Sequence, residues 1–399
     1  MRIVCAGGGP AGLYFAVLAK LANPAHEITV LERNPAGVTY GWGVVFWDDL
    51  LDDLYRCDPV SARMIWDAAW KWDEYEVRVS GKPTTHVGGY GFSMGRRGLL
   101  EILARRATDL GVDIRYEVEL TEDSEFGDAD LIVACDGARS RLREPHTDHF
   151  GTRVDTGRNK YIWLGTPHVF DTFTFGFERT EAGWIWFHAY PFTHDTSTFI
   201  VECQPATWAA LGLDRADAQE GCARLADIFA KHLDGQPLVD HRASVGSTGW
   251  LNFRRLTNER WHHGSVVLMG DAAHTTHFAI GSGTKLAMQD AIALSEALAT
   301  GDPMPAALAA YEHRRKTEMA PLQRAAKASS EWFERLPEYI DRPASQFAFA
   351  LFDRRGDFPA WRYALHVATQ PRPLRAGLRW ALSARKWTRV RRRMATSAR

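Results

Sequence analysis

The stretch that decides the fold is Gly7–Gly12, which reads Gly-Gly-Gly-Pro-Ala-Gly. An apolar segment typical of a short strand, Arg2–Cys5, comes directly before it, and a helical segment, Leu13–Leu21, follows it. A second strand is expected at Glu27–Leu31, and it ends at the acid Glu32. This order of strand, glycine-rich turn, helix, strand and acid is typical of the opening of a Rossmann-type dinucleotide-binding fold.

Each glycine of the turn has its own task in such a fold. Gly7 permits the tight turn, Gly9 lets backbone amides approach a pyrophosphate, and Gly12 lets the helix pack close to the strand. The N-terminus of the helix attracts the anion, and Glu32 can accept hydrogen bonds from the ribose. The turn alone leaves NAD, NADP and FAD open as cofactors. The contacts expected in this region are Gly7, Gly9, Pro10, Ala11, Gly12, Glu32 and Arg33.

Two later motifs narrow this choice. Asp136–Ser140 reads Asp-Gly-Ala-Arg-Ser, Gly270–His274 reads Gly-Asp-Ala-Ala-His, and each follows an apolar strand. Gly281–Gly283 then opens a long helix that carries Asp290. Together with the first turn, these motifs resemble the three fingerprints of class A flavoprotein monooxygenases, the family of p-hydroxybenzoate hydroxylase.

The resemblance implies a bound FAD and a transient visit by NADH or NADPH. A second Gly-x-Gly-x-x-Gly turn after a strand is missing from the sequence, which argues against a dedicated nicotinamide domain. Asp271 is expected to bind the ribityl chain, and Arg96 begins an Arg-x-x-Leu helix that contacts FAD in relatives. The further cofactor contacts that the resemblance implies are Gly43, Val44, Arg96, Asp136, Asp271, Gly283, Thr284 and Lys285.

Three local sequences are similar to one branch of this family. Gly41–Phe46, Phe192–Glu202 and His274–Lys285 look like the corresponding parts of hydroxylases that act on coenzyme A thioesters of aromatic acids. Salicylyl-CoA 5-hydroxylase and the flavin half of anthraniloyl-CoA monooxygenase are such enzymes. The resemblance implies hydroxylation of an aromatic acyl thioester by O₂ and NAD(P)H, through a flavin C4a-hydroperoxide. Salicylyl-CoA, attacked at the carbon para to its hydroxyl, is the substrate that we expect.

Other readings of the sequence stay open. A free aromatic or indole substrate is one, because tryptophan hydroxylases are also similar. A thioester on a carrier protein is another, and a flavoprotein reductase or an intermediate-binding protein is a third. A flavin-dependent halogenase is disfavoured, since its Trp-x-Trp-x-Ile-Pro motif fails after Trp184-Ile185-Trp186.

Two histidines are candidates for the group that draws a proton from the substrate hydroxyl. His277 lies in the loop expected to face the flavin, and His188 lies on an aromatic strand. A structural histidine, hydrogen-bonded locally, is the alternative for both. The substrate ring is expected to lie against Trp42, Trp163, Trp186 and Phe278. We expect no metal site.

The fold class expected is α/β, with a Rossmann-type FAD-binding domain, an inserted and mostly antiparallel substrate domain, and a helical C-terminal region. Residues 1–75, 95–158 and 255–330 are assigned to the FAD-binding domain, and 76–94 and 159–254 to the substrate domain. Residues 331–399 form the C-terminal helical, basic segment.

Composition sets broad limits on function. The chain has 399 residues, 45% of them hydrophobic, and a formal net charge of −1, which argues against a nucleic-acid-binding protein. Five scattered cysteines without a CxxC pair predict reduced thiols of a cytoplasmic protein. No apolar run is long enough to span a bilayer.

Charge is nevertheless uneven along the chain. Residues 372–399 contain ten basic residues and no acid, whereas the rest of the chain carries a net charge of −11. The arginines of this tail could bind the phosphates of coenzyme A through bidentate hydrogen bonds. A solvated basic helix with a buried apolar stripe, or attraction to an anionic membrane surface, are the alternatives.

Overall fold

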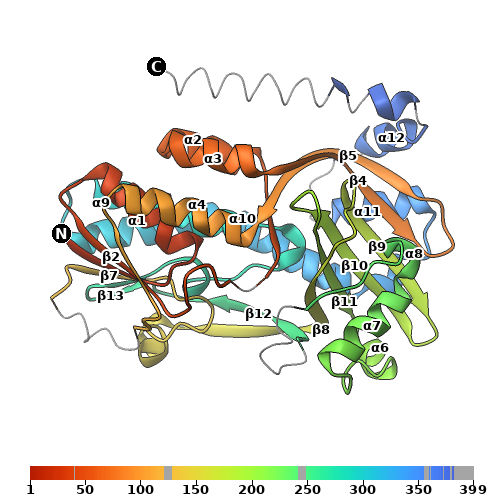
Figure 1. Cartoon of the computed structure of the whole chain (residues 1–399), viewed down its shortest axis with the longest axis horizontal. Helices are drawn as coiled ribbons and strands as arrows, with labels where there is room; N and C mark the ends of the chain where they lie inside the picture. Colours follow the sequence, from red (N-terminus) through yellow and green to blue (C-terminus); the bar gives the residue numbers. More distant parts are fainter. Residues whose placement is uncertain are drawn as a thin grey trace.

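Two β-sheets and a set of covering helices form the protein in the computed structural model (Figure 1). The structure describes residues 1–39, 41–120, 128–240, 249–354, 359, 361–371, 373–377, 380 and 381. The helices in this part of the chain are α1 (Pro10–Ala22), α2 (Asp48–Cys57), α3 (Pro59–Ala68), α4 (Arg96–Asp109), α5 (Thr147–Phe150), α6 (Pro205–Ala210), α7 (Ala218–Ile228), α8 (Ala230–Leu233), α9 (Gly283–Leu298), α10 (Met304–Glu334), α11 (Ala344–Asp353) and α12 (Trp361–Ala368).

The first sheet has six strands, of which all but the edge strand β13 pair in parallel. In sheet order they are β13 (His262–His263), β14 (Val266–Leu268), β7 (Leu131–Ala134), β1 (Arg2–Ala6), β2 (Glu27–Glu32) and β6 (Asp113–Tyr116). Strands β7 and β14 are buried along their whole length, as expected for parallel strands that are covered on both faces. Helix α1 packs between α4 and α9, and α10 packs against α9. The predicted Rossmann-type sheet is confirmed.

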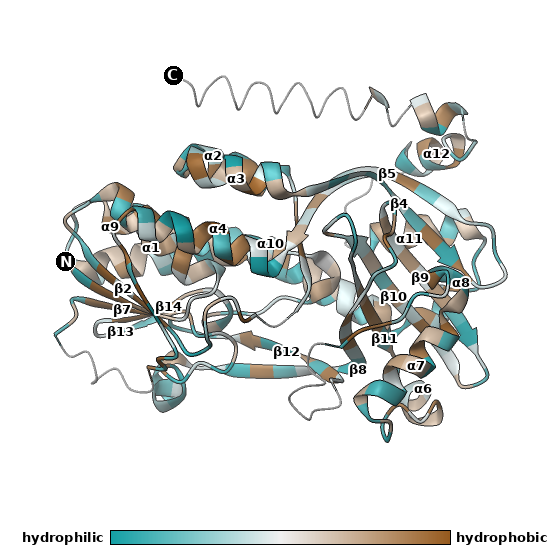
Figure 2. Cartoon of the chain, viewed as in Figure 1, coloured by the Kyte–Doolittle hydropathy of each residue, from teal (hydrophilic) through white to brown (hydrophobic). Residues whose placement is uncertain are grey.

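The second sheet has eight strands and is antiparallel except for the β4–β9 pair. In sheet order they are β12 (Leu251–Thr257), β8 (Arg153–Thr166), β11 (Ser197–Cys203), β10 (Gly183–Pro191), β9 (Phe173–Thr180), β4 (Trp70–Val79), β5 (Thr85–Gly95) and β3 (Gly43–Phe46). Phe187 and its neighbours pack one face against Leu225 of α7, and Trp186 packs the other face against α10 and α11. Figure 2 shows hydrophobic residues, in brown, concentrated on β2, β7 and β14 of the first sheet.

Four of the expected domain boundaries fall inside strands. The boundary after residue 75 divides β4, that after 94 separates the last residue of β5, that after 158 divides β8, and that after 254 divides β12. Strands β3 and β4 begin within the range assigned to the FAD-binding domain, but both pair in the eight-stranded sheet. A local sequence pattern identifies a strand, whereas its pairing partners depend on tertiary contacts.

The C-terminal segment adds α11 and α12 beside the second sheet, and Figure 1 shows α12 near β4 and β5. One alternative for the basic tail was a helix with a buried stripe of Leu374, Leu378, Trp387, Val390 and Met394. The structure contradicts this alternative at Leu374, which is 58% exposed. An exposed leucine lacks the partner surface that burial requires. The other stripe residues and most of the tail arginines lie outside the described residues. The helices that the structure describes include none long and apolar enough to cross a membrane.

Candidate functional site

A cavity of about 1150 Å³ is lined by strands of the second sheet and by the segments that follow β1, β7 and β14 of the first sheet. A second cavity, of about 580 Å³, lies over the glycine-rich turn and β2. Gly9, Arg96, Cys135 and Gly137 line both cavities, so the two adjoin at the N-terminus of α1. The carboxyl ends of parallel strands are where nucleotides bind in open α/β sheets.

The three motif glycines differ in what surrounds them. Gly7 has a φ of +119°, and a Cβ there would lie 2.4 Å from the Cys135 carbonyl oxygen. A Cβ on Gly12 would lie 2.2 Å from the carbonyl oxygen of Gly7. A Cβ on Gly9 would meet no protein atom within 4 Å. Gly7 and Gly12 are therefore required by the packing of the protein, whereas Gly9 keeps the cavity wall open.

Two of the acids that line the second cavity are predicted cofactor contacts. Glu32 accepts hydrogen bonds at Oε2 from the Gly8 amide (2.8 Å) and at Oε1 from the Asn34 amide (2.9 Å). Asp136 accepts at Oδ2 from the Arg141 amide (2.6 Å), while its buried Oδ1 has no hydrogen-bond partner. Burial raises the pKa of Asp136. An unpartnered oxygen of this kind costs free energy unless a ligand satisfies it.

Arg96 stands at the junction of the two cavities. Its Nε donates to Thr39 Oγ1 at 3.1 Å. Burial lowers the pKa of Arg96, and the carboxylates of Asp271 and Glu32 oppose that shift. Asp271 is exposed to the larger cavity, and desolvation by the surrounding protein raises its pKa although Arg96 opposes the change. The Arg96 guanidinium thus lies at the junction of the two cavities and interacts with Asp271 of the larger one and Glu32 of the second.

All but one of the remaining predicted cofactor residues line one of the two cavities. The structure places Pro10, Ala11, Gly43, Val44, Gly283 and Thr284 on the wall of the larger cavity. Arg33 lines the second cavity, where it pairs with Glu119 at 3.5 Å. Lys285 lines neither cavity; its Nζ pairs with Asp49, and it borders a separate hollow between α9 and α10. Lys285 points away because its helical position lies on the outer side of α9.

Asp290, on α9, holds the Gly270–Asp271 turn in place. Its Oδ2 accepts from the Gly270 amide (3.0 Å) and lies 2.7 Å from His274 Nε2, while Oδ1 accepts from Arg315 Nε (2.7 Å). Burial alone would raise the pKa of Asp290, but His274 and Arg315 together hold it below its usual value. The signal in the sequence was an acid inside an otherwise apolar stretch of a helix.

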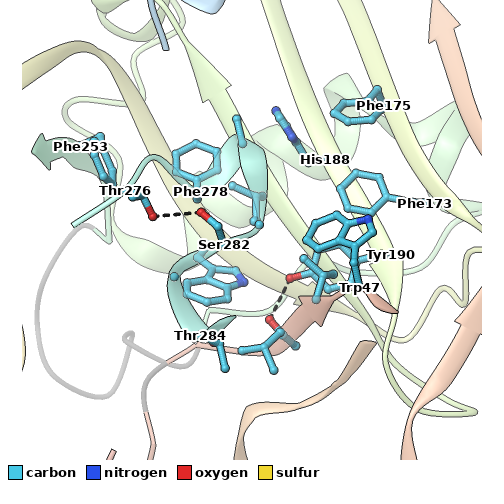
Figure 3. A pocket seen from close by; sticks show the side chains of 18 of the residues that line it. Trp47, Phe173, Phe175, His188, Tyr190, Phe253, Thr276, Phe278, Ser282 and Thr284 are labelled. Atoms are coloured by element: carbon cyan, nitrogen blue, oxygen red, sulfur yellow. Dashed lines mark hydrogen bonds between the residues drawn. The ribbon is translucent and has the colours of Figure 1, made fainter. Parts of the chain in front are cut away.

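The far end of the larger cavity is aromatic (Figure 3). His188 lies there between Phe175 and Phe278, with ring centroids 4.9 and 5.8 Å from its own. The pKa of His188 lies well below its usual value because of burial and because of the nearby positive charge of Arg354. His188 therefore faces the cavity as a neutral imidazole at neutral pH.

Arg354 brings a positive charge to the same aromatic end. Its guanidinium lies 6.0 Å from the Phe175 ring centroid and 5.4 Å from that of Phe333, and His188 contacts both rings. Its Nε donates to Ser329 Oγ (2.8 Å), and its Nη2 donates to the Ala279 carbonyl (2.7 Å). No pattern in the sequence indicated a role for Arg354, because this residue follows α11 and lies far along the chain from the motifs.

Some predicted site residues do not reach the cavity. His277 Nδ1 accepts a hydrogen bond from the Ala279 amide (3.2 Å), and burial lowers the pKa of His277 to about 3. Trp186 is fully buried against Phe333, and Trp42 packs over Gly165. Packing takes these three side chains into the protein interior, whereas Trp163 and Phe278 do line the cavity.

Glu202 is a buried acid behind His188 that the sequence analysis missed. Its Oε1 accepts from Asn159 Nδ2 (2.7 Å), its Oε2 accepts from Trp186 Nε1 (3.2 Å), and His188 Nε2 lies 3.9 Å from Oε2. Burial raises the pKa of Glu202 from 4.5 to about 7. The signal in the sequence was a lone acid in the apolar strand at Ser197–Cys203.

This raised pKa predicts a pH-dependent stability. The folded protein binds the Glu202 proton more tightly than the unfolded chain does, so the contribution is complete below about pH 4.5 and is lost as the pH rises through about 7. The loss amounts to at most about 3 kcal/mol, at about 1.4 kcal/mol per pKa unit. Urea unfolding near pH 5 and near pH 8 should show that Glu202→Gln flattens this slope. An equal slope in both proteins would contradict the prediction.

Three observations fit FAD to these adjoining cavities. The wall at Gly9 is open to a ligand, Asp136 Oδ1 lacks a partner, and Arg96 brings a cation to the N-terminus of α1, where phosphates bind well. Because the two cavities adjoin at the N-terminus of α1, one dinucleotide could extend through both of them.

The open wall at Gly9 yields a second prediction. The φ of −76° at this position is accessible to alanine, so Gly9→Ala should leave the FAD-free protein as stable as before. Its methyl group would crowd the cofactor at a cost of about 1–3 kcal/mol, which raises the Kd for FAD about 10- to 100-fold. Fluorescence titration of FAD measures this. Gly221→Ala, on α7 and outside both cavities, is the control, and an unchanged Kd for Gly9→Ala would refute the role of the wall.

Comparisons with known proteins agree with this geometry. Residues 96–326 match the family described as FAD binding domain. The chain is 40% identical over 367 residues to salicyloyl-CoA 5-hydroxylase of Streptomyces sp, covering 89% of this chain and 70% of that protein. It is 37% identical over 366 residues to 3-hydroxy-4-methyl-anthranilyl-[aryl-carrier protein] 5-monooxygenase of Streptosporangium sibiricum, covering 91% and 96%.

A solved structure shows the same fold at lower identity. The tetrameric form of 2-methyl-3-hydroxypyridine-5-carboxylic acid oxygenase superposes with a TM-score of 0.68 at 20% identity, covering 89% of this chain and 95% of that chain. The expected fold class, the FAD cofactor and the use of NAD(P)H are confirmed. The chain belongs to the FAD binding domain family and is an FAD-dependent aromatic monooxygenase.

Proposed function

We propose that the enzyme hydroxylates an aromatic acyl thioester, with salicylyl-CoA as substrate and the carbon para to its hydroxyl as the site of attack. The observation that carries the proposal is the aromatic end of the cavity, where Arg354 and a neutral His188 lie against the same two rings. The positive charge of Arg354 would stabilise the ionised hydroxyl of a substrate ring that packs against these aromatic side chains. The likeness to two relatives that are named for thioester substrates supports the acyl thioester.

The FAD contacts follow the order of the residues along the cavities. Glu32 and Asp136 would hold the adenosine end, and Arg96 with the N-terminus of α1 would hold the pyrophosphate. Asp271 would bind the ribityl chain, and Gly43, Val44, Gly283 and Thr284 would border the ring system. When bound and reduced by NAD(P)H, FAD supplies the activated oxygen from O₂.

The side chains around the substrate then act on its ring. Arg354 stabilises the negative charge that develops on the ring hydroxyl, which enriches the para carbon in electrons. His188 accepts a hydrogen bond from that hydroxyl as a neutral imidazole, and Glu202 lies behind it. Phe173, Phe175 and Phe278 surround the ring and exclude water. We assign no such role to His277, because it does not line the cavity and its Nδ1 accepts from the Ala279 amide.

A substrate panel tests the proposal. It comprises salicylyl-CoA, anthraniloyl-CoA, the two free acids and tryptophan, with NADH oxidation measured together with product mass. We expect coupled hydroxylation of the CoA thioesters and little product from the free acids. Equal turnover of the free acids, or NADH oxidation without a hydroxylated product from any thioester, would overturn the proposal.

A thioester held on a carrier protein is the second candidate substrate. The relative that is 37% identical is named for an aryl-carrier-protein substrate. The phosphopantetheine arm of a carrier protein would hold the aromatic acid by the same kind of thioester. Adding an acylated carrier protein to the panel separates the two. Location in the cytoplasm is part of the same proposal, and the five free cysteines of the chain support it.

A further inference from the structure

The larger cavity extends beyond the aromatic end to the C-terminal segment. Trp361, Arg362, Leu365 and His366 of α12 line it, and so does Thr369 just after the helix. The match to the FAD binding domain family covers residues 96–326, so α12 lies outside that matched region. We propose that this rim of five residues binds the pantetheine arm and the phosphates of a coenzyme A thioester. This inference rests on the proposed function.

Apolar side chains of the rim are both exposed and part of the cavity wall. Trp361 is 61% exposed and Leu365 is 45% exposed. Exposed apolar side chains that also border a cavity indicate a binding surface, since covering them releases about 25 cal/mol per Å². The pantetheine arm has methylene and methyl groups beside its two amides, and these apolar groups could cover Trp361 and Leu365.

The rim is fixed to the body of the protein. Gln370 Nε2 donates to the His86 carbonyl (2.8 Å), and the His86 amide donates to Gln370 Oε1 (3.2 Å). His366 Nε2 lies 3.1 Å from the Ser345 carbonyl of α11. These contacts tie α12 to β5 and to α11, and Figure 1 shows the helix beside that strand. A preorganised surface of this kind binds a ligand at a lower entropic cost than a loose one.

Charge favours a phosphate-bearing ligand at the rim. The sequence contains no acid after Asp357, while residues 358–399 contain eleven lysines and arginines, beginning with Arg362. Arg362 lines the cavity and is exposed. Coenzyme A carries a pyrophosphate and a 3′-phosphate, which guanidinium groups bind through paired hydrogen bonds.

The size of the cavity agrees with a long substrate. Pockets for drug-sized ligands usually measure about 300–1,000 Å³. This cavity measures about 1150 Å³ and borders the predicted flavin contacts, the aromatic end and α12. A flavin ring and a small free acid would leave the part next to α12 unfilled, whereas a thioester with its arm would reach the rim.

Two variants test the rim in the full-length, FAD-loaded enzyme. Trp361→Ala combined with Leu365→Ala removes the apolar surface, and Arg362→Glu reverses the charge. We expect each to raise the KM for salicylyl-CoA about tenfold with kcat unchanged. The KM for the N-acetylcysteamine thioester of salicylate, which lacks the phosphates and most of the arm, should change less than about twofold. Trp380→Ala, exposed and outside the cavity wall, is the control.

Several outcomes would overturn the inference. One is an unchanged KM for salicylyl-CoA in both rim variants. Another is an equal rise of KM for both thioesters, because the substitutions would then affect binding of the aromatic ring or the fold. If the rim variants raise the KM for an acylated carrier protein alone, the rim binds the carrier protein and the inference of a coenzyme A site is wrong. Calorimetric titration with coenzyme A itself tests the binding site at the rim separately from the proposed hydroxylation of salicylyl-CoA. Binding to the wild type that is lost in Arg362→Glu would support the rim even if no thioester is hydroxylated, and absence of binding to the wild type would refute it.

Discussion

Asp290→Asn is expected to lower the free energy of unfolding by about 3 kcal/mol, because it removes one charge of a buried ion pair. Arg315 is 2% exposed and, among the residues that the structure describes, would keep Glu318 as its acidic partner. The Gly270 amide and His274 would also lose the carboxylate oxygen that they share. Since Asp271 belongs to that turn, the Kd for FAD should rise as well. Urea unfolding of the FAD-loaded protein and an FAD titration measure the two effects.

Glu296→Gln is the matched control on the same helix. Glu296 also joins two arginines, with Arg56 Nη1 and Arg314 Nη1 each 2.6 Å from one of its oxygens, but its side chain is 39% exposed. Water screens such a pair, so the expected loss is below about 1 kcal/mol. Equal losses for the two variants would show that burial does not set the contribution of Asp290.

Arg354→Gln is expected to lower kcat about 100-fold, the usual effect of losing one group that stabilises developing charge. Without the positive charge, the substrate hydroxyl should ionise at higher pH. The pH profile of kcat should therefore move toward alkaline values, so that part of the activity returns as the pH rises. Steady-state hydroxylation of salicylyl-CoA, followed by product mass across the pH range, measures both changes.

Two controls separate the charge of Arg354 from its packing. Arg354→Lys keeps the charge and should retain more activity than Arg354→Gln at neutral pH. Ser329→Ala removes the hydroxyl that accepts from Arg354 Nε without touching the charge, and kcat should fall less than about fivefold. A pH profile that stays in place in Arg354→Gln would mean that the residue is structural only.

Local patterns in the sequence were sufficient for the nucleotide-binding half of the fold. The apolar strands before Gly7, Asp136 and Gly270 are the buried strands β1, β7 and β14 of one parallel sheet. Each pattern works because a strand that is covered on both faces must be apolar throughout, and because only glycine fits where backbones meet. Gly7 and Gly12 meet that steric condition in the structure.

The choice between the two candidate histidines required the tertiary structure. His188 and His277 both lie in aromatic surroundings, and the sequence offers no reason to prefer either. In the folded chain His188 lines the cavity, whereas the Nδ1 of His277 accepts from a backbone amide. Which side chain reaches a cavity depends on how distant segments pack, and a local pattern does not carry that information.

The sequence by itself therefore determined the parallel sheet, the FAD motifs and the family, because each depends on residues close together in the chain. Tertiary structure alone decided that β3 and β4 join the second sheet, that Arg354 lies beside His188, and that Trp361 borders the cavity. These placements join segments that are far apart in sequence. Their physical basis is the burial of apolar surface between sheets and helices, a non-directional force that leaves no local pattern to read.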